Sequence, residues 1–325
     1  MKLTVSLGLL LVFLAGCGDA REFASSVQLD GSSTVFPISV AVAEKFLAVR
    51  PEIRVTVGIS GTGGGFKKLA NGEIDINNAS RPINASERLA LAKAHIEFLE
   101  LPIAYDGLSV VVNPNNDWVD FLTIDELQRI WQPDSLVKTW RDVRFEWPDK
   151  PIRLYGPGVD SGTFDHFTKV VNGESQRSRA DFSASEDDNL LVQGIAGDQY
   201  ALGYFGHVYF FENSDSVRLV PVDAGFGPVS PSVSSITSGD YKRLARPVFL
   251  YVRVSALERA EVRDFVSFYL ESAAQFVTEL GYFNLPDSVY RQAAVRFEQR
   301  IIGSRYLHDD EAELELEPTA MQGLL

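Results

Sequence analysis

The chain has 325 residues, of which 45% are hydrophobic and 23% charged, a composition typical of a globular protein long enough to form two lobes with separate cores. Its formal net charge of −14 argues against nucleic-acid binding, because contact with a phosphate backbone requires a basic face. The charge does not exclude a small anionic ligand, since backbone N–H groups and one arginine can outweigh a distant acidic field. The single cysteine cannot form a disulfide within one chain, so the fold depends on its hydrophobic core.

The N-terminal segment, residues 1–17, has the pattern of a secretory signal, with one lysine followed by an apolar run too short to span a bilayer. The segment ends in Leu14-Ala15-Gly16-Cys17, which is similar to a bacterial lipobox. We therefore predict a lipoprotein signal and lipidation at Cys17. The protein would then lie outside the cytoplasm, in the periplasm or at the cell surface, anchored to the membrane by acyl chains. A cysteine of no consequence within the signal is the alternative.

The chain repeats one local pattern three times: a strand, a turn of hydroxyl residues and glycines, and a helix. In the first unit, the strand Val27–Asp30 leads through Gly31-Ser-Ser-Thr34 to a helix that has Pro37 in its first turn. The other two units are the strand Val55–Val57 with the turn Ser60–Gly65, and the strand Ile152–Tyr155 with the turn Gly156–Thr163, with helices expected from Phe66 and Phe164.

Such turns direct unpaired backbone N–H groups toward an anion, and their small side chains allow a ligand to approach the backbone. The central turn does not match the familiar phosphate-binding motifs. A P-loop requires Gly-Lys followed by Ser or Thr, whereas Lys67 lies between Phe66 and Lys68. The glycines also lack the G-x-G-x-x-G spacing of a dinucleotide site. Plain turns and helix N-caps are the alternative interpretation of each unit.

Two further segments are predicted to cross between the halves of the protein. The first is the pair of strands Phe98–Tyr105 and Leu108–Val112, separated by a break at Asp106-Gly107, and the second is Pro247–Val254. Between them, Thr123-Ile-Asp-Glu126 has the capping-box pattern of a helix start. Residues 306–325 are rich in Asp and Glu and are predicted to form a solvated, largely disordered acidic tail.

Taken together, the turns resemble those of the PstS-type phosphate-binding protein of the bacterial high-affinity phosphate ABC importer. The motifs that carry the resemblance are Gly31-Ser-Ser-Thr-Val-Phe-Pro37, Gly58–Gly65, Asn78-Ala-Ser-Arg-Pro82, Asp160-Ser-Gly-Thr163 and Leu285-Pro-Asp-Ser-Val289. The resemblance implies an α/β, two-lobe type II periplasmic-binding-protein fold, with mixed sheets flanked by helices and a ligand cleft between the lobes. It also implies a discontinuous domain I, residues 27–105 and 248–305, and a domain II, residues 106–247.

The same resemblance implies which residues bind phosphate through hydroxyl or backbone groups. They are Ser33, Thr34 and Val35 in the first loop, Ser60 and Thr62 in the second, and Ser161, Gly162 and Thr163 in the last. The first loop can be aligned in two ways, so the inclusion of Ser33, and of Phe36 on its other side, depends on the alignment. No catalytic residue and no metal ligand is implied.

Two positions depart from the better-known members of the family. Where they have an aspartate directly after the Ala-Ser of the third loop, this chain has Arg81, and where they have an arginine shortly before Ser-Gly-Thr, it has Pro157. We therefore predict that Arg81 forks onto two phosphate oxygens, with a solvated surface arginine as the alternative.

A carboxylate that accepts a hydrogen bond from protonated phosphate would disfavour sulfate, which carries no proton. We predict Asp160 for this role, with Asp106 in second place, and Asp160 could also pair with Arg81 across the cleft. The alternative for Asp160 is an ordinary N-cap of the third helix.

These predictions describe a monomer that binds inorganic phosphate without a cofactor and delivers it to the permease subunits of an ABC importer. An exported phosphatase or serine hydrolase is a weaker hypothesis, because neither Ser60 nor Ser161 lies in G-x-S-x-G and the histidines lie in no motif that supplies a base or a metal site. A phosphate or oxyanion sensor or adhesin of the same fold is the third hypothesis.

Overall fold

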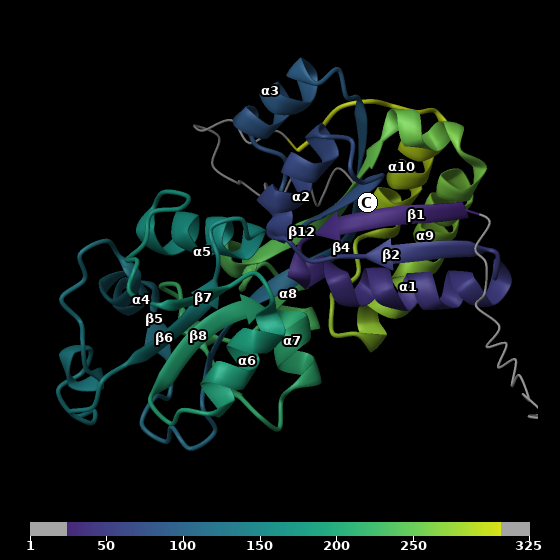
Figure 1. Ribbon diagram of the computed structural model, residues 1–325. Helices are drawn as coiled ribbons and strands as arrows, with labels where there is room; N and C mark the ends of the chain where they lie inside the picture. Colours follow the sequence, from purple (N-terminus) through teal and green to yellow (C-terminus); the bar gives the residue numbers. More distant parts are fainter. Residues whose placement is uncertain (1–24, 307–325) are drawn as a thin grey trace, which may run out of the picture.

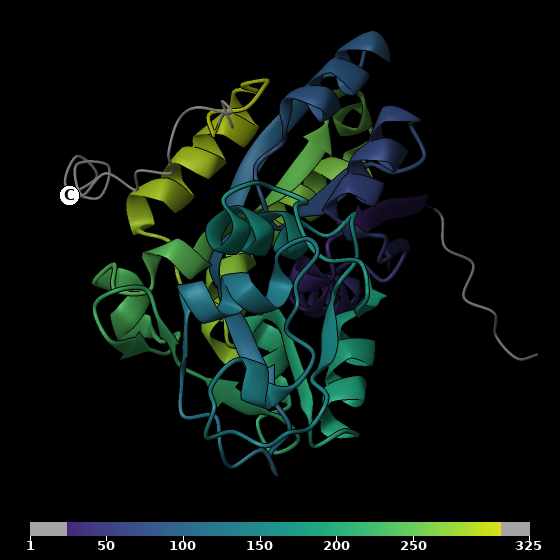
Figure 2. The ribbon, with the colours of Figure 1, turned by 90° about the vertical axis from the view of Figure 1, so that its left-hand side faces the viewer.

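The computed structural model describes residues 25–306; the predicted signal segment with Cys17, and residues 307–325 of the predicted tail, lie outside the described residues. The helices and strands form two lobes, at the upper right and lower left of Figure 1 and above and below each other in Figure 2. Within the described range, no helix is both long and apolar enough to cross a membrane. The predicted mixed α/β fold of two lobes is confirmed.

Lobe I combines parallel strands from the N-terminal part of the chain with helices from both ends. Its strands are β1 (Ser25–Gly31), β2 (Ile53–Val57) and β3 (Ile76–Ala79), and its helices are α1 (Phe36–Val49), α2 (Gly61–Ala70), α3 (Ala85–Lys93), α9 (Ala260–Glu279) and α10 (Asp287–Glu298). β1 pairs in parallel with both β2 and β3. The connecting turns therefore lie at the carboxyl ends of the strands, where ligands bind in open α/β sheets.

Lobe II is built from the middle of the chain. Its strands are β5 (Leu122–Thr123), β6 (Arg153–Pro157), β7 (Ser183–Ser185), β8 (Ala201–Gly206), β9 (Arg218–Val220), β10 (Val222–Asp223) and β11 (Pro228–Val229). Its helices are α4 (Ile124–Trp131), α5 (Gly162–Asn172), α6 (Asp188–Ala196), α7 (His207–Glu212) and α8 (Val233–Thr237). α4 begins with the predicted capping box between Thr123 and Glu126. The core of lobe II contains the buried aromatic residues Trp131, Trp140 and Tyr204.

Two long strands connect the lobes. β4 (Phe98–Val112) pairs antiparallel with β12 (Ala245–Arg253) through residues 98–107 and with β8 through residues 108–112. The predicted break at Asp106-Gly107 is wrong, because strand pairing on both parts of β4 overrides the turn preference of this dipeptide. The main sheet has the order β2-β1-β3-β12-β4-β8-β6-β7, so it continues from one lobe into the other. Its register places Arg246 opposite Asp106.

α2 begins earlier than the glycine-rich sequence predicts. It starts at Gly61, whose φ of +74° favours glycine, and it includes the glycines expected in a turn. A Cβ at Gly65 would lie 1.9 Å from Asn77 Oδ1 and 2.8 Å from Gly31 Cα. The glycines therefore allow α2 to pack tightly on β1 and β3, and this packing outweighs their poor intrinsic helix propensity.

Candidate functional site

The carboxyl ends of β1 and β6 bring two of the predicted loops together where the lobes meet. Thr34 lies in the short 3-10 helix η1 (Ser33–Val35) after β1, and Thr163 lies in the first turn of α5 after β6. Their hydroxyl oxygens are 3.1 Å apart, although the two residues belong to different lobes. Both side chains are fully buried, so the lobes are in direct contact at this point.

The second and third loops take part in the same contact between the lobes through Thr62 and Ser80. Thr62 Oγ1 accepts a hydrogen bond from the Ser80 backbone N–H (3.1 Å) and lies 3.2 Å from Ser80 Oγ. Gly162 of lobe II packs against both residues: a Cβ there would lie 2.5 Å from Ser80 Oγ and 2.8 Å from Thr62 Oγ1. Because a side chain at this position would have to displace these hydroxyls, the approach of the lobes requires a glycine.

Arg246 enters this cluster from the second crossing strand, β12. Its Nη1 donates to the Gly162 carbonyl (2.7 Å), and its Nη2 donates to Thr163 Oγ1 (2.5 Å) and Asp106 Oδ2 (3.1 Å). Thr34 Oγ1 lies 3.5 Å from the same Nη2. The side chain is 2% exposed, and its Nε has no hydrogen-bond partner among the described residues. Arg246 thus contacts both lobes and retains an unused donor.

Asp106 fixes the orientation of Arg246. Its Oδ1 accepts the backbone N–H of His207 (3.0 Å), and its Oδ2 faces the guanidinium. Burial raises the pKa of Asp106 to about 6, although the charge of Arg246 acts in the opposite direction. Burial lowers the pKa of Arg246, and Asp106 offsets part of this effect. The two side chains form a buried ion pair in which each partner limits the cost of burying the other.

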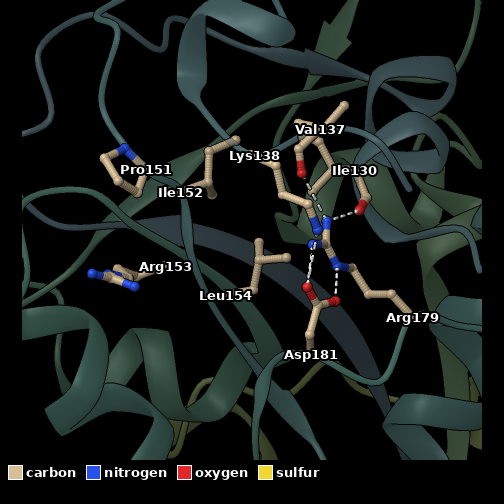
Figure 3. Close-up of a pocket in the computed structure, with 9 residues that line it drawn as sticks. All are labelled: Ile130, Val137, Lys138, Pro151, Ile152, Arg153, Leu154, Arg179 and Asp181. Carbon is tan, nitrogen blue, oxygen red and sulfur yellow. Dashed lines mark hydrogen bonds and ion pairs between the residues drawn. The ribbon is translucent and has the colours of Figure 1, made fainter. Parts of the chain in front are cut away.

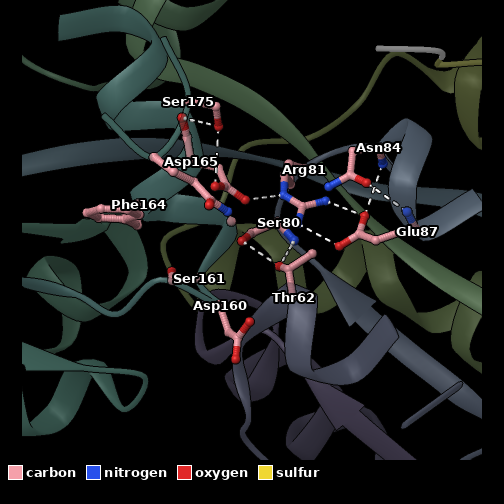
Figure 4. Close-up of polar contacts among 12 residues, drawn as sticks. Thr62, Ser80, Arg81, Asn84, Glu87, Asp160, Ser161, Phe164, Asp165 and Ser175 are labelled. Carbon is pink, nitrogen blue, oxygen red and sulfur yellow. Dashed lines mark hydrogen bonds and ion pairs between the residues drawn. The ribbon is translucent and has the colours of Figure 1, made fainter. Parts of the chain in front are cut away.

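Arg81 lies in the third loop, but its guanidinium faces carboxylates (Figure 4). Nη1 and Nη2 donate to the two oxygens of Glu87 (2.7 and 2.8 Å), Nη1 also donates to the Pro82 carbonyl, and Nε donates to Asp165 of lobe II (2.5 Å). Burial lowers the pKa of Arg81, but Glu87 and Asp165 outweigh burial and raise the pKa above its usual value. A phosphate fork at Arg81 would therefore have to displace one of these carboxylates.

Asp160 lies at the edge of the contact between the lobes, where it pairs with Lys67 (2.7 Å) and not with Arg81. Its carbonyl accepts the backbone N–H of Gly63 from lobe I (2.8 Å). The alternative of an Asp160 helix cap is wrong, because Ser161 caps α5 and its Oγ accepts the Thr163 N–H (3.1 Å). The carboxylate is 36% exposed, so an acceptor role there would compete with water and with Lys67.

The other predicted residues divide between the cluster and the interior of lobe I. Val35 and Ser33 are buried in η1, and the carbonyls of Ser33 and Thr34 accept hydrogen bonds from the hydroxyls of Tyr209 (2.8 Å) and Tyr282 (2.6 Å). These bonds hold the first loop in place. Ser60 Oγ instead donates to Asp30 (2.5 Å) within lobe I, so the structure does not bring this hydroxyl to Arg246.

The structure adds Ser80 and Arg246 to this cluster, and the pKa of the buried Asp188 carboxyl responds to Ser33 and Arg246. In the sequence, Ser80 belongs to the third-loop motif Asn78-Ala-Ser-Arg-Pro82. Arg246 directly precedes the apolar strand predicted from Pro247. A charged residue at the edge of a buried strand is the sequence feature that could have identified it. Asp188 is fully buried at the start of α6. In the sequence it belongs to the acidic run Glu186-Asp-Asp188, which is typical of an ordinary helix start.

A separate cavity of about 240 Å³ lies in lobe II (Figure 3). Its buried arginine, Arg179, donates from Nε and Nη2 to Asp181 and from Nη1 to the carbonyls of Ile130 and Val137. These donors are satisfied within the protein, so the cavity offers little to an anion. Between residues 25 and 306, no group of three or more His, Cys, Asp or Glu residues is arranged to hold a metal ion.

The cluster at Arg246 can bind an oxyanion through an arginine, several hydroxyls and the N-terminus of α5. His207 is nearby, but its Nδ1 contacts Ser109 Oγ (2.9 Å). Burial lowers the pKa of His207 to about 4, so the ring is neutral at physiological pH. Together, the fold and this site define a class of proteins: two-lobe α/β binding proteins in which loops from both lobes surround a single binding site.

Known proteins of similar sequence and structure belong to this class. Residues 19–273 match the model of the PBP superfamily domain. The chain is 42% identical over 303 residues to Protein SphX of Synechocystis sp., covering 92% of this chain and 90% of that protein. It is 34% identical over 319 residues to the phosphate-binding protein PstS of Staphylococcus saprophyticus, covering 95% and 97%.

A solved structure is similar to this chain over most of its length. It is provisionally assigned as the substrate-binding protein of a phosphate ABC transporter from Clostridium perfringens and contains bound phosphate. It matches with a TM-score of 0.68 and 25% identity, covering 80% of this chain and 99% of that one. The present chain therefore belongs to the PBP superfamily and, within it, to the PstS-type phosphate-binding proteins.

Proposed function

We propose that this protein is an extracytoplasmic substrate-binding protein that captures inorganic phosphate and delivers it to the permease subunits of an ABC importer. The observation that carries the proposal is the position of Arg246, which is buried between the lobes with an unused Nε and lies among the hydroxyls of Thr34 and Thr163. Arginine is well suited to phosphate because its fixed fork of donors matches the anion's oxygens.

In this proposal, Arg246 supplies the charge and both lobes supply neutral donors. The donors are the hydroxyls of Ser33, Thr34, Thr62, Ser80, Ser161 and Thr163, together with the backbone N–H of Gly162. The backbone N–H of Val35, which donates to the Ser32 carbonyl (3.2 Å), would have to exchange that bond for one to the anion. Arg81 and Asp160 hold the lobes together around the anion, and Ser60 supports the second loop through Asp30. The relatives named PstS and the phosphate-bound structure from Clostridium perfringens support phosphate as the ligand.

Isothermal titration calorimetry of the mature chain with inorganic phosphate tests the proposal. We expect saturable heat with one site per chain and no release of phosphate from phosphate esters, because the site offers donors without a paired nucleophile and base. Absence of binding heat, or steady ester hydrolysis, would contradict it.

We further propose that Cys17 anchors the protein to a membrane through acyl chains and that the protein acts as a monomer. The anchor is supported by the lipobox-like Leu14-Ala15-Gly16-Cys17. Cys17→Ser should release the protein into the soluble fraction or leave it unprocessed. Unchanged membrane fractionation of this variant would count against the anchor.

A further inference from the structure

Glu100 is a buried carboxylate of β4 that the site described so far does not use. Its Oε2 accepts hydrogen bonds from the hydroxyls of Tyr251 (2.7 Å) and Ser304. Its Oε1 accepts the backbone N–H groups of Arg305 (2.7 Å) and Tyr306 (3.2 Å). All four donors are electrically neutral, and together they offset the cost of burying a charge. Glu100 therefore joins β12 to the segment of chain that follows α10.

Three of these donors belong to residues 303–306, which we call the C-terminal strap. At its start, the backbone N–H of Gly303 donates to the Phe98 carbonyl of β4 (2.8 Å). At its end, the ring of Tyr306 packs edge-on against Phe249 of β12, with the ring centroids 5.2 Å apart. The strap is therefore fixed to both of the strands that connect the lobes.

Tyr251 connects Glu100 to the third loop. Its hydroxyl accepts the backbone N–H of Ile83 (2.8 Å) while it donates to Glu100. Burial, together with the charge of Glu100, raises the pKa of Tyr251 well above the ordinary value of 10, so the hydroxyl keeps the proton that it donates. The Tyr251 ring packs against the ring of Phe66 in α2, and Arg81 Cζ lies 6.0 Å from the centroid of the Phe66 ring. Tyr251 thus supports both the backbone two residues after Arg81 and the ring over which Arg81 lies.

We propose that Glu100 and Tyr251 are positioning residues that act through Arg81. They hold the third loop so that the Arg81–Asp165 ion pair can form when the lobes close around phosphate; the inference rests on the proposed function. Arg81 donates to Asp165 of lobe II (2.5 Å) and to Glu87 of its own lobe, so a displacement of its backbone would distort the bond between the lobes. Hydrogen bonds weaken steeply when their geometry is distorted. Loss of the support should therefore let the lobes reopen faster and release phosphate sooner.

The test is the dissociation rate of phosphate, measured by stopped flow on wild type and on Tyr251→Phe. The variant keeps the ring and removes only the hydroxyl. We expect about fivefold faster dissociation, which corresponds to the loss of one ordinary hydrogen bond. In an Arg81→Gln background, the same substitution should change the rate less than about twofold, because the ion pair through which it acts is already absent. A purely structural role of Tyr251 would give equal changes in the two backgrounds.

Tyr241→Phe is the matched control. It also removes one buried hydroxyl, which donates to the Leu108 carbonyl (2.7 Å) in the core of lobe II. We expect it to lower the thermal stability and to change the dissociation rate of phosphate less than about twofold. Asp165→Asn provides a second background, which breaks the same ion pair and leaves Arg81 in place. The comparison can therefore be made in whichever background folds.

Glu100→Met tests the other positioning residue, because methionine has a similar length and removes both acceptor oxygens. We expect dissociation at least about fivefold faster than in wild type, with little further change when Tyr251→Phe is added, since both changes break one connection. Equal rate changes with and without the Arg81–Asp165 ion pair, or no change in Tyr251→Phe, overturn the inference while leaving the proposed function intact. Wild-type protein that binds no phosphate would instead overturn the proposed function.

Discussion

Two buried arginines lie where the lobes meet, and their surroundings differ in charge. Arg81 is 7% exposed and Arg246 is 2% exposed, so burial does not distinguish them. Arg81 is paired with two carboxylates, Glu87 and Asp165, whereas Arg246 is paired with Asp106 and otherwise donates to a carbonyl and a hydroxyl. One arginine with two carboxylates has an excess of negative charge, which opposes an anion. The difference in direct carboxylate partners favours Arg246 over Arg81 as the arginine of the proposed phosphate site.

The pairing of Arg81 also gives it a different role. Glu87 accepts hydrogen bonds from Arg81 and from the Asn84 N–H, as part of the capping box at the start of α3. Arg81 therefore connects the first turn of α3 in lobe I to Asp165 in lobe II. We call the Arg81–Asp165 ion pair the latch, because its two residues belong to different lobes and can pair only when the lobes are together.

The largest expected effect is the loss of phosphate binding in Arg246→Gln. Hydrogen bonds to charged groups contribute about 1.5–3 kcal/mol each, and loss of two of them corresponds to at least about a hundredfold weaker binding. The measurement is the phosphate affinity by calorimetry. Arg243→Gln is the matched control, because Arg243 is exposed and lies on the same segment.

Removal of Arg246 alone leaves Asp106 buried without its partner, which destabilises proteins by about 3–5 kcal/mol in comparable cases. The double variant Arg246→Gln with Asp106→Asn restores neutrality and should fold. If this double variant, shown to be folded by its thermal unfolding, binds phosphate like wild type, Arg246 is not the group that recognises the anion.

An intermediate effect is expected at the Arg81–Asp165 latch. Arg81→Gln and Asp165→Asn should each weaken phosphate binding about tenfold, through faster dissociation, and the double variant should lose little more, because both changes break the same bond. The measurements are affinity by calorimetry and the dissociation rate by stopped flow.

A direct role of Arg81 predicts a different pattern. If Arg81 forks onto phosphate, Asp165→Asn frees a donor and should preserve or strengthen binding, while Arg81→Gln still weakens it. Opposite effects of the two single variants would therefore reinstate Arg81 as a ligand and remove the contrast with Arg246.

The smallest effect is expected at the exposed pair Lys67–Asp160, which also joins the lobes. Lys67 is 70% exposed and Asp160 is 36% exposed, and exposed ion pairs contribute about 0–1 kcal/mol. Lys67→Met should weaken phosphate binding less than about fivefold, and the difference should diminish at high salt. Lys138→Met is the control, because its pair with Asp181 is similarly exposed but lies within lobe II. A loss as large as that of Arg81→Gln would show that closure depends on charge at the edge as well.

The amino-acid sequence by itself determined the local units of this protein. The order of strand, turn and helix in the three units, the capping box at Thr123 and the buried strand near Pro247 are predicted correctly, because each depends on residues within one turn or one strand of each other. The start of α2 is the exception, since packing places the glycines after Ser60 in the helix. The loops that contain Thr34 and Thr163 are predicted for the same reason, because the hydroxyl and glycine residues that form each turn are adjacent in the sequence.

The tertiary structure alone decided the charges around the site. Arg246 faces Asp106 through the register of β12 on β4, across 140 residues of sequence, and Asp165 reaches Arg81 across 84 residues. Asp188 is distinguished from the acidic residues beside it by burial and by the absence of a hydrogen-bond partner within residues 25–306. No local pattern encodes these pairings, because the free energy of a buried charge depends on which partners the whole fold brings within hydrogen-bond distance.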